Sequence, residues 1–316
     1  MKKLSIIFIC SSIACNVLGQ QDMGYSQNMF NLMSVNPGYA GSQDMIGLNF
    51  LQRLQWLGIV DKGAPSSTVF SANAPFTLFD RSHGVGLTVI NNNVAYTNDL
   101  NLNLSYAYRS KMKFGDGKIG IGASVGLVNS TINSSNLHLG YTGADDAIPN
   151  GKASPVLDLG LGVFYNTEKL YMGISATHIF TGKFKFGSTE STKESYFYIP
   201  HYYITAGYTF QLANPSLELE PSFFIQTVGA TTTLNFNTNI VYNNHVWGGI
   251  SYRAGQAVTG LFGLELSEGI RFGVAYDFET TILNTISHGS LEVAVIYNFK
   301  LKKERLPQKY KSIRFL

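Results

Sequence analysis

Residues 100–109 read Leu-Asn-Leu-Asn-Leu-Ser-Tyr-Ala-Tyr-Arg, so apolar and polar side chains alternate along the whole stretch. Successive side chains of a β-strand point to opposite faces, which puts leucines and tyrosines on one face and small polar residues on the other. About ten strand residues tilted by about 45° cross a bilayer core, and tyrosine is enriched where that core meets the headgroups. The stretch therefore predicts a membrane-crossing strand with an apolar outer face and a polar inner face.

The composition of the chain favours the same interpretation. Charged residues are 14% of the 316 residues, against roughly 25% in soluble domains, and aromatic residues reach 13%. Beyond residue 19 the sequence has no run of about 18 apolar residues, which a membrane helix would need. A closed barrel is the other structure that pairs its backbone groups in lipid. We therefore predict an all-β fold, a transmembrane antiparallel β-barrel.

Similar alternation recurs along the chain and predicts about fourteen strands. An even number is typical of outer-membrane barrels. The faces opposite the apolar rows carry glycines and a few charges, which include Arg109, Asp158, Arg271, Asp277 and Glu292. Trp247 is interpreted as an aromatic residue at the membrane interface. The predicted strands are residues 45–55, 67–74, 84–92, 99–109, 118–129, 156–165, 170–179, 202–212, 217–227, 233–242, 246–253, 258–266, 270–278 and 291–299.

The lengths of the connections predict the orientation of the barrel. Outer-membrane barrels have short periplasmic turns and longer outside loops, and an even strand number puts both chain ends on one side. With both ends in the periplasm, every second connection should be short, and residues 166–169, 213–216, 243–245 and 267–269 fit this rule. Two further periplasmic connections, residues 75–83 and 110–117, are longer than expected. The longest outside loops are residues 130–155 and 180–201.

The two ends of the chain differ from the barrel in composition. Residues 1–19 have the basic start, short apolar run and small residues of a signal peptide, and contain both cysteines. Residues 20–44 form a separate segment before the barrel of residues 45–299. Residues 300–316 carry seven basic side chains and one acidic one. When this tail, Lys2 and Lys3 are left out, the rest of the chain has fourteen basic and nineteen acidic side chains. The basic tail is either a solvated end or an arm that docks on an acidic surface.

The sequence contains no pattern that indicates catalysis. Its six histidines are scattered, and none has the spacing of metal ligands. Asp145 and Asp146 are interpreted as a solvated acidic turn, with a calcium site as the alternative. We expect no enzymatic activity, no cofactor and no metal, and nothing beyond the basic tail suggests nucleic-acid binding.

Several short motifs stand near the start of the mature chain. They are Tyr25-Ser26-Gln27, Met29-Phe30-Asn31, Asn36-Pro37, Tyr39-Ala40-Gly41-Ser42, Arg53, Gln55-Trp56 and Gly63-Ala64-Pro65. Together these motifs resemble the opening of the PorP/SprF family of type IX secretion system membrane proteins. One departure is Gly38, where alanine is common in the family, and we expect it only to loosen a turn.

This resemblance implies a non-enzymatic outer-membrane barrel that serves type IX secretion. Members of the family typically accompany a large secreted client protein that bears a type B C-terminal domain, often an adhesin, and help to translocate it or to hold it at the surface. One branch of the family works with a periplasmic ring lipoprotein. The resemblance thus implies three partners: outer-membrane lipid, a secreted client and the ring lipoprotein. An outer-membrane porin or solute transporter is the alternative function.

The segment before the barrel is too apolar to be a free tail. We expect it to fold back into the lumen as a plug or to cover the periplasmic rim, with Asn31 and Asn36 hydrogen-bonded to the wall. Arg53, Gln55 and Trp56 are expected to brace this plug or to meet the client. The full set of candidate plug or partner-binding residues is Tyr25, Gln27, Met29, Phe30, Asn31, Asn36, Pro37, Tyr39, Arg53, Gln55 and Trp56.

Overall fold

The computed structural model describes residues 23–59, 63–112, 115–133, 151–180, 183–186, 193–197, 199–266 and 269–300. The predicted signal peptide, the acidic turn at Asp145 and Asp146, and the basic tail beyond Lys300 lie outside these residues. Within the described part of the chain, no helix is long and apolar enough to span a bilayer.

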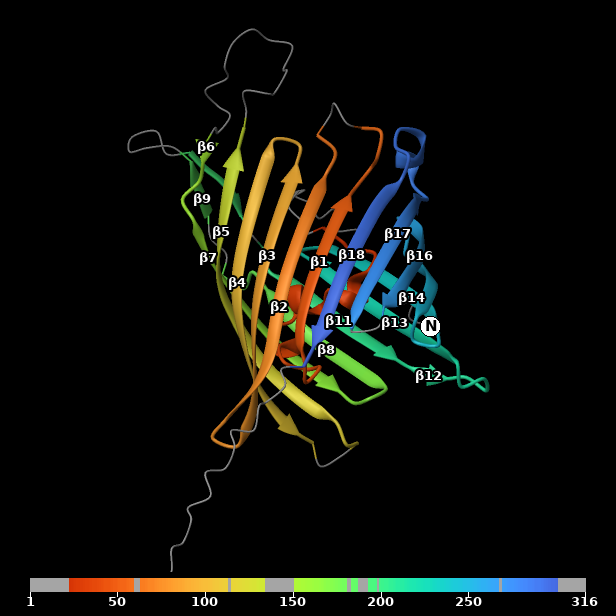
Figure 1. The fold of residues 1–316 in the computed structure, drawn as a ribbon. Coiled ribbons are helices and arrows are strands. Elements are labelled where there is room, and N and C mark those ends of the chain that lie inside the picture. The colour runs from red at the N-terminus through yellow and green to blue at the C-terminus, as the bar shows by residue number, and fades with distance from the viewer. Residues whose placement is uncertain are drawn as a thin grey trace, which may run out of the picture.

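Fourteen antiparallel strands close into a barrel (Figure 1). Closure comes from pairing of the first strand with the last, and β11 pairs with both β8 and β13. The strands are β1 (Ile46–Leu54), β2 (Ser66–Leu78), β3 (Arg81–Val94), β4 (Thr97–Lys111), β5 (Lys118–Ile132), β7 (Val156–Asn166), β8 (Leu170–Thr177), β11 (His201–Tyr208), β13 (Leu217–Val228), β14 (Thr231–Tyr242), β15 (Val246–Arg253), β16 (Ala257–Leu266), β17 (Ile270–Glu279) and β18 (Ser290–Phe299).

Each predicted strand corresponds to one strand of the barrel, so the predicted fold class is confirmed. Among the described residues, four short strands lie outside this ring. β6 (Gly151–Lys152) pairs with β5, and β12 (Phe210–Gln211) pairs with β13. β9 (Lys183–Phe186) and β10 (Lys193–Phe197) form a separate hairpin. We call the end of the barrel where β1 begins and β18 ends the lower mouth, and the opposite end the upper mouth (Figure 1).

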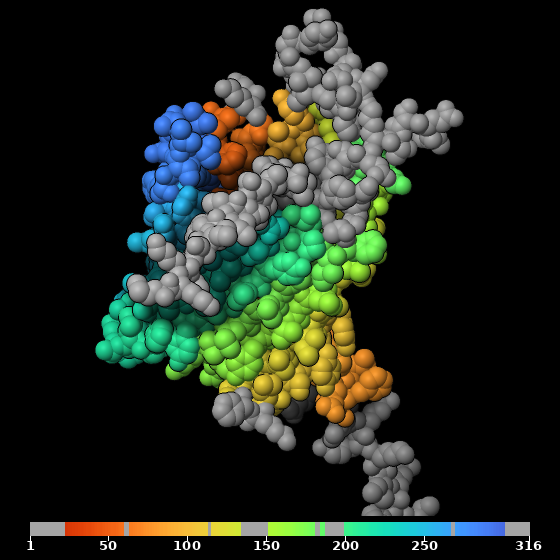
Figure 2. All heavy atoms as spheres, turned by 180° about the vertical axis from the view of Figure 1, so that it is seen from behind, coloured from red at the N-terminus to blue at the C-terminus, as the bar shows by residue number. Residues whose placement is uncertain are grey.

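The alternation along β4 is as predicted. Leu104 is 58% exposed on the outer face, whereas Asn101 is 1% exposed on the inner face. The outer side chains of β5, β7, β17 and β18 are likewise mostly aliphatic or aromatic. Figure 2 shows the wall from behind, where the green strands cover the surface between the yellow and the cyan strands. Because this surface is apolar, lipid is the solvent that it fits.

The predicted connection of residues 75–83 is largely strand, which corrects the sequence-based boundaries. Residues 75–83 include the end of β2 and the start of β3, joined by a turn at Phe79 and Asp80 with φ of 49° and 56°. Positive φ at both positions matches the tight hairpin turn that suits the twist of a sheet. Pro75 is tolerated because β1 pairs with β2 only as far as Asn73, so this part of β2 has a free edge. The other long connection, residues 110–117, shortens only to residues 112–117, because β4 ends at Lys111 and β5 begins at Lys118.

Candidate functional site

Residues 23–44, which precede β1, lie inside the barrel. We call residues 23–44 the inner segment; it contains the one-turn helices η1 (Asn28–Phe30), α1 (Leu32–Val35) and η2 (Pro37–Tyr39). Helices this short are not stable alone, so the wall of the barrel must hold them in place. Many polar side chains of the segment are nevertheless buried, namely Ser26, Gln27, Asn28, Asn31, Asn36 and Ser42.

A buried ionic cluster marks one attachment of the inner segment. Arg53 on β1 contacts Asp277 on β17 at 2.6 Å and Glu292 on β18 at 3.0 Å. Arg253 on β15 lies 3.5 Å from Asp277. Two arginines and two carboxylates thus balance one another inside the lumen. Such a cluster is tolerable only if its remaining hydrogen-bonding groups are also satisfied.

Ser26 and Gln27 of the inner segment supply many of the hydrogen bonds that the cluster needs. The Glu292 carboxylate accepts hydrogen bonds from the backbone N–H of Ser26 at 2.9 Å and of Gln27 at 2.7 Å. The Ser26 hydroxyl donates to Asp277 at 2.6 Å and accepts from Arg53 and Arg253, each at 3.0 Å. The cluster therefore binds the inner segment rather than only joining strands.

Asn36 fixes the middle of the inner segment to the opposite wall. Its Oδ1 accepts from the backbone N–H of Gly38 at 2.9 Å, and its Nδ2 donates to the carbonyl of Val163 on β7 at 3.1 Å. Pro37 begins η2, where its missing N–H costs nothing. The hydroxyl of Ser175 on β8 donates to the carbonyl of Val35 at 2.7 Å. Asn31 is also buried, and its Oδ1 accepts from Asn49 on β1 at 3.4 Å.

Glycines in the wall allow the backbone of the inner segment to approach closely. A Cβ at Gly122 would lie 2.5 Å from the carbonyl carbon of Pro37, and one at Gly162 would lie 2.1 Å from Asn36 Oδ1. A Cβ at Gly38 would lie 2.9 Å from the carbonyl oxygens of Gly120 and Gly162. Gly38 therefore has a packing role, and our expectation that it only loosens a turn is wrong.

Arg109 and Tyr39 hold the lower part of the inner segment. Arg109 donates to the carbonyl of Gly38 at 3.1 Å and to Asn166 Oδ1 at 2.5 Å. The ring of Tyr39 packs edge-on against Phe164 on β7, with 5.1 Å between the centroids. Burial raises the pKa of Tyr39 to about 12, so its phenol stays neutral at physiological pH.

Phe30 packs in an apolar pocket formed by β14 to β17. Its ring lies edge-on to Trp247 at 5.1 Å, and Met29 contacts the same group, which comprises Val241, Trp247, Leu261 and Ala275. Trp247 is 3% exposed. It therefore faces the lumen, and the interpretation of Trp247 as a membrane-interface residue is wrong. On another part of the wall, Tyr25 forms a 2.8 Å hydrogen bond with Ser67 on β2.

The structure divides the candidate residues into two groups. Tyr25, Gln27, Met29, Phe30, Asn31, Asn36, Pro37 and Tyr39 lie in the inner segment, and Arg53 reaches it from the wall. Gln55 and Trp56 lie above β1, where their backbone N–H groups donate to the Pro65 carbonyl and to Ser290. The sequence reasoning missed Arg253, because its position at a strand end gave no signal. Asp277 and Glu292 were recognised only as charges in the lumen.

These features define the class of the protein: a membrane β-barrel whose lumen is occupied by its own N-terminal segment. The described residues contain no group of three or more His, Cys, Asp or Glu that could hold a metal ion. The family described as type IX secretion system membrane protein PorP/SprF matches residues 17–297. The chain belongs to this family, and family and fold are those of an integral outer-membrane protein.

Solved structures with a similar fold are outer-membrane channels. The Ralstonia pickettii toluene transporter TbuX is 10% identical, with a TM-score of 0.51 over 85% of this chain and 93% of that chain. The monoaromatic hydrocarbon channel TodX, as a deltaS2S3 mutant, is 14% identical, with a TM-score of 0.50 over 84% and 93% of the two chains. At these identities the likeness concerns the fold alone. Comparison with the sequences of curated proteins gives no match.

Proposed function

We propose that this protein assists the translocation or the surface anchoring of a secreted client that bears a type B C-terminal domain. Membership of a type IX secretion family supports this proposal. The observation that carries it is the occupied lumen: the inner segment fills the barrel between the Arg53 cluster and the Asn36 contacts. A barrel held in this state acts as a closed scaffold for a partner rather than as an open passage for small solutes.

We orient the lower mouth toward the periplasm and the upper mouth toward the outside, as in other outer-membrane barrels. The client would then meet the upper connections, and a periplasmic ring lipoprotein would meet the lower mouth. At the upper mouth, Phe184 and Phe186 of β9 are buried against Val128, Ile132 and Ala153. This packing gives a firm base to the upper connections where we place client binding, since loops that carry binding residues are usually supported by a rigid scaffold.

Purification from native outer membranes in mild detergent tests the client assignment. We expect a large secreted protein with a type B C-terminal domain to be recovered with the barrel. Deletion of the barrel should remove that client from the cell surface while other secreted proteins remain. Normal surface display in the deletion strain would contradict the proposal.

Liposome swelling distinguishes the alternative function of porin or solute transporter. We expect liposomes that contain the wild-type protein not to swell in small sugars, because the inner segment occupies the lumen. An open diffusion porin reconstituted in parallel provides the positive control. Rapid swelling with the wild-type protein would favour the porin and argue against a closed scaffold.

A further inference from the structure

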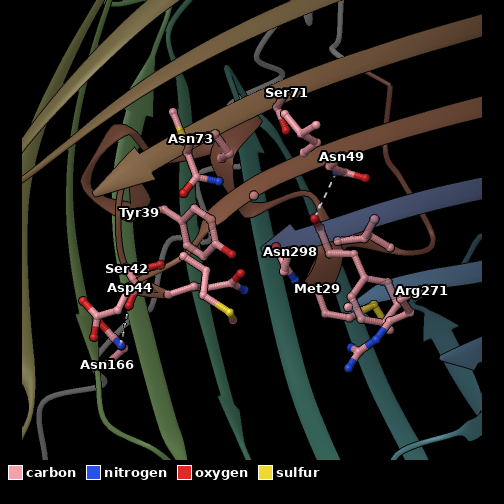
Figure 3. A pocket seen from close by; sticks show the side chains of 18 of the residues that line it. Met29, Tyr39, Ser42, Asp44, Asn49, Ser71, Asn73, Asn166, Arg271 and Asn298 are labelled. Atoms are coloured by element: carbon pink, nitrogen blue, oxygen red, sulfur yellow. Dashed lines mark hydrogen bonds between the residues drawn. The ribbon is translucent and has the colours of Figure 1, made fainter. Parts of the chain in front are cut away.

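A cavity of about 900 Å³ lies between the inner segment and the lower mouth (Figure 3). Met29, Tyr39 and Asp44 of the inner segment form part of its lining, and Arg271 and Asn298 belong to the opposite wall. Figure 3 shows these side chains gathered around one space. The volume is within the range of sites that take a ligand rather than a few waters. We call this space the lower cavity.

Acidic groups outnumber basic groups in the lower cavity. Its lining contains four carboxylates, at Asp44, Asp116, Glu168 and Glu265, and two cations, at Lys118 and Arg271. Lys118 pairs with Asp44, and Arg271 pairs with Glu265. Neither Asp116 nor Glu168 forms an ion pair with another described residue. The pairing therefore uses up both cations and leaves two carboxylates for a positively charged ligand.

Two further carboxylates extend the negative charge beside the cavity. Glu218 and Glu220 lie on β13 at even spacings from Phe224 and Gln226, whose side chains are buried in the lumen. By the two-residue period of a strand, all four share the lumen face. Because β13 runs in the same direction as β1, Glu218 and Glu220 near its start lie toward the lower mouth.

An unsatisfied acceptor also lines the lower cavity. Asn49 is 7% exposed, and its Nδ2 donates to the carbonyl of Phe30 at 3.0 Å. Its Oδ1 has no hydrogen-bond partner among the described residues. A buried acceptor without a partner is costly, so a ligand that brings an N–H donor gains from meeting it. Lysine and arginine side chains offer such donors and no acceptor.

We propose that the lower cavity is a binding site for a lysine- and arginine-rich peptide, and that its occupant is residues 301–316 of the same chain. These residues bring six basic side chains and one acidic one: Lys302, Lys303, Arg305, Lys309, Lys311 and Arg314 against Glu304. They also follow directly on β18, whose Asn298 lines the cavity. A tethered segment of matching charge has a high effective concentration at a site beside its point of attachment. The inference does not depend on the identity of the client.

Disulfide cross-linking in intact outer membranes tests this occupancy, because the sequence has no cysteine after Cys15. The test pair is Gln43→Cys with Lys309→Cys, because Gln43 lines the cavity without contributing to its charge. The control pair is Asp80→Cys with Lys309→Cys, since Asp80 lies in a turn at the lower end of the barrel and does not line the cavity. We expect a several-fold higher yield of intrachain disulfide for the test pair. Raising the salt to about 1 M, where the Debye length is ~3 Å, should lower that yield.

A charge variant separates binding from mere proximity. Replacing Lys302, Lys303, Arg305 and Lys311 by Gln in the test pair should reduce the yield to that of the control pair. Equal yields for the two pairs would overturn the proposal. An interchain disulfide in the test pair would overturn the choice of occupant, because it would place another molecule's tail in the cavity. Folded migration on an SDS gel confirms that each variant forms the barrel.

Discussion

Arg53 and Asp277 meet inside the lumen at 2.6 Å, although β18 separates their strands in the sheet. Neither side chain is more than 1% exposed. The hydroxyl of Ser26 contacts both side chains, because it accepts a hydrogen bond from Arg53 and donates one to Asp277. The same pair therefore stabilises both the closing strands of the barrel and the attachment of the inner segment.

Removing one member of this pair should be more damaging than removing both. Arg53→Met or Asp277→Leu leaves the buried cluster with one unbalanced charge, which costs about 3–5 kcal/mol. In the double variant, Arg253 and Glu292 remain and balance each other. We expect each single variant to lower the temperature at which folded migration on an SDS gel is lost, and the double variant to lower it by less than either single variant does. Additive losses would contradict coupling within the cluster.

The sequence predicts the barrel well because its signal is local and repeated. Alternation along residues 100–109 indicates which side chains face lipid and which face the lumen, and the same rule applies to every strand. Boundaries were less certain at the lower mouth, where β2 continues past Pro75 toward the turn at Phe79. There the pairing with β3 determines the strand, and single-strand periodicity does not contain that information.

The contacts of the inner segment depend on pairs of residues far apart in the chain. Ser26 and Glu292 are separated by 266 positions, and no local pattern relates them. Trp247 illustrates the same limit, since an aromatic residue on a strand suits either the membrane interface or a lumen pocket. Only the position of Phe30 decides between the two. The plug role and the partner-binding role of the candidate residues stay predictions.

Adding a methyl group where the wall touches the inner segment should destabilise the protein. In Gly122→Ala, the new Cβ would lie 2.5 Å from the carbonyl carbon of Pro37. Overpacking of this kind typically costs about 1–3 kcal/mol. Gly260→Ala is the matched control, because a Cβ at Gly260 on β16 meets nothing within 4 Å. Thermal loss of folded migration should shift downward for Gly122→Ala only; equal behaviour of the two variants would argue against close packing at this contact.

Trp247 offers a spectroscopic test of its position in the lumen. The chain has two tryptophans, so Trp56→Phe leaves Trp247 as the single emitter. We expect neither brominated lipid nor aqueous acrylamide to quench it strongly, because Phe30 and the wall enclose it. Strong quenching by brominated lipid would show that Trp247 lies at the membrane interface and would contradict its position in the lumen. Phe30→Ala in the same background should make acrylamide quenching more effective.

Deleting residues 21–42 should open the barrel. The inner segment occupies the lumen through the contacts of Ser26, Asn36 and Phe30, so its removal leaves a polar passage lined by asparagine, serine and the Arg53 cluster. We expect larger single-channel conductance in planar bilayers than for the full-length protein. The deletion also leaves Glu292 without two backbone donors, so Glu292→Gln is included as a second variant with an intact inner segment. Because that variant weakens the attachment without shortening the chain, it should show brief openings to the conductance of the deletion. A deletion variant that folds yet conducts no better than the full-length protein would show that the inner segment does not close the lumen.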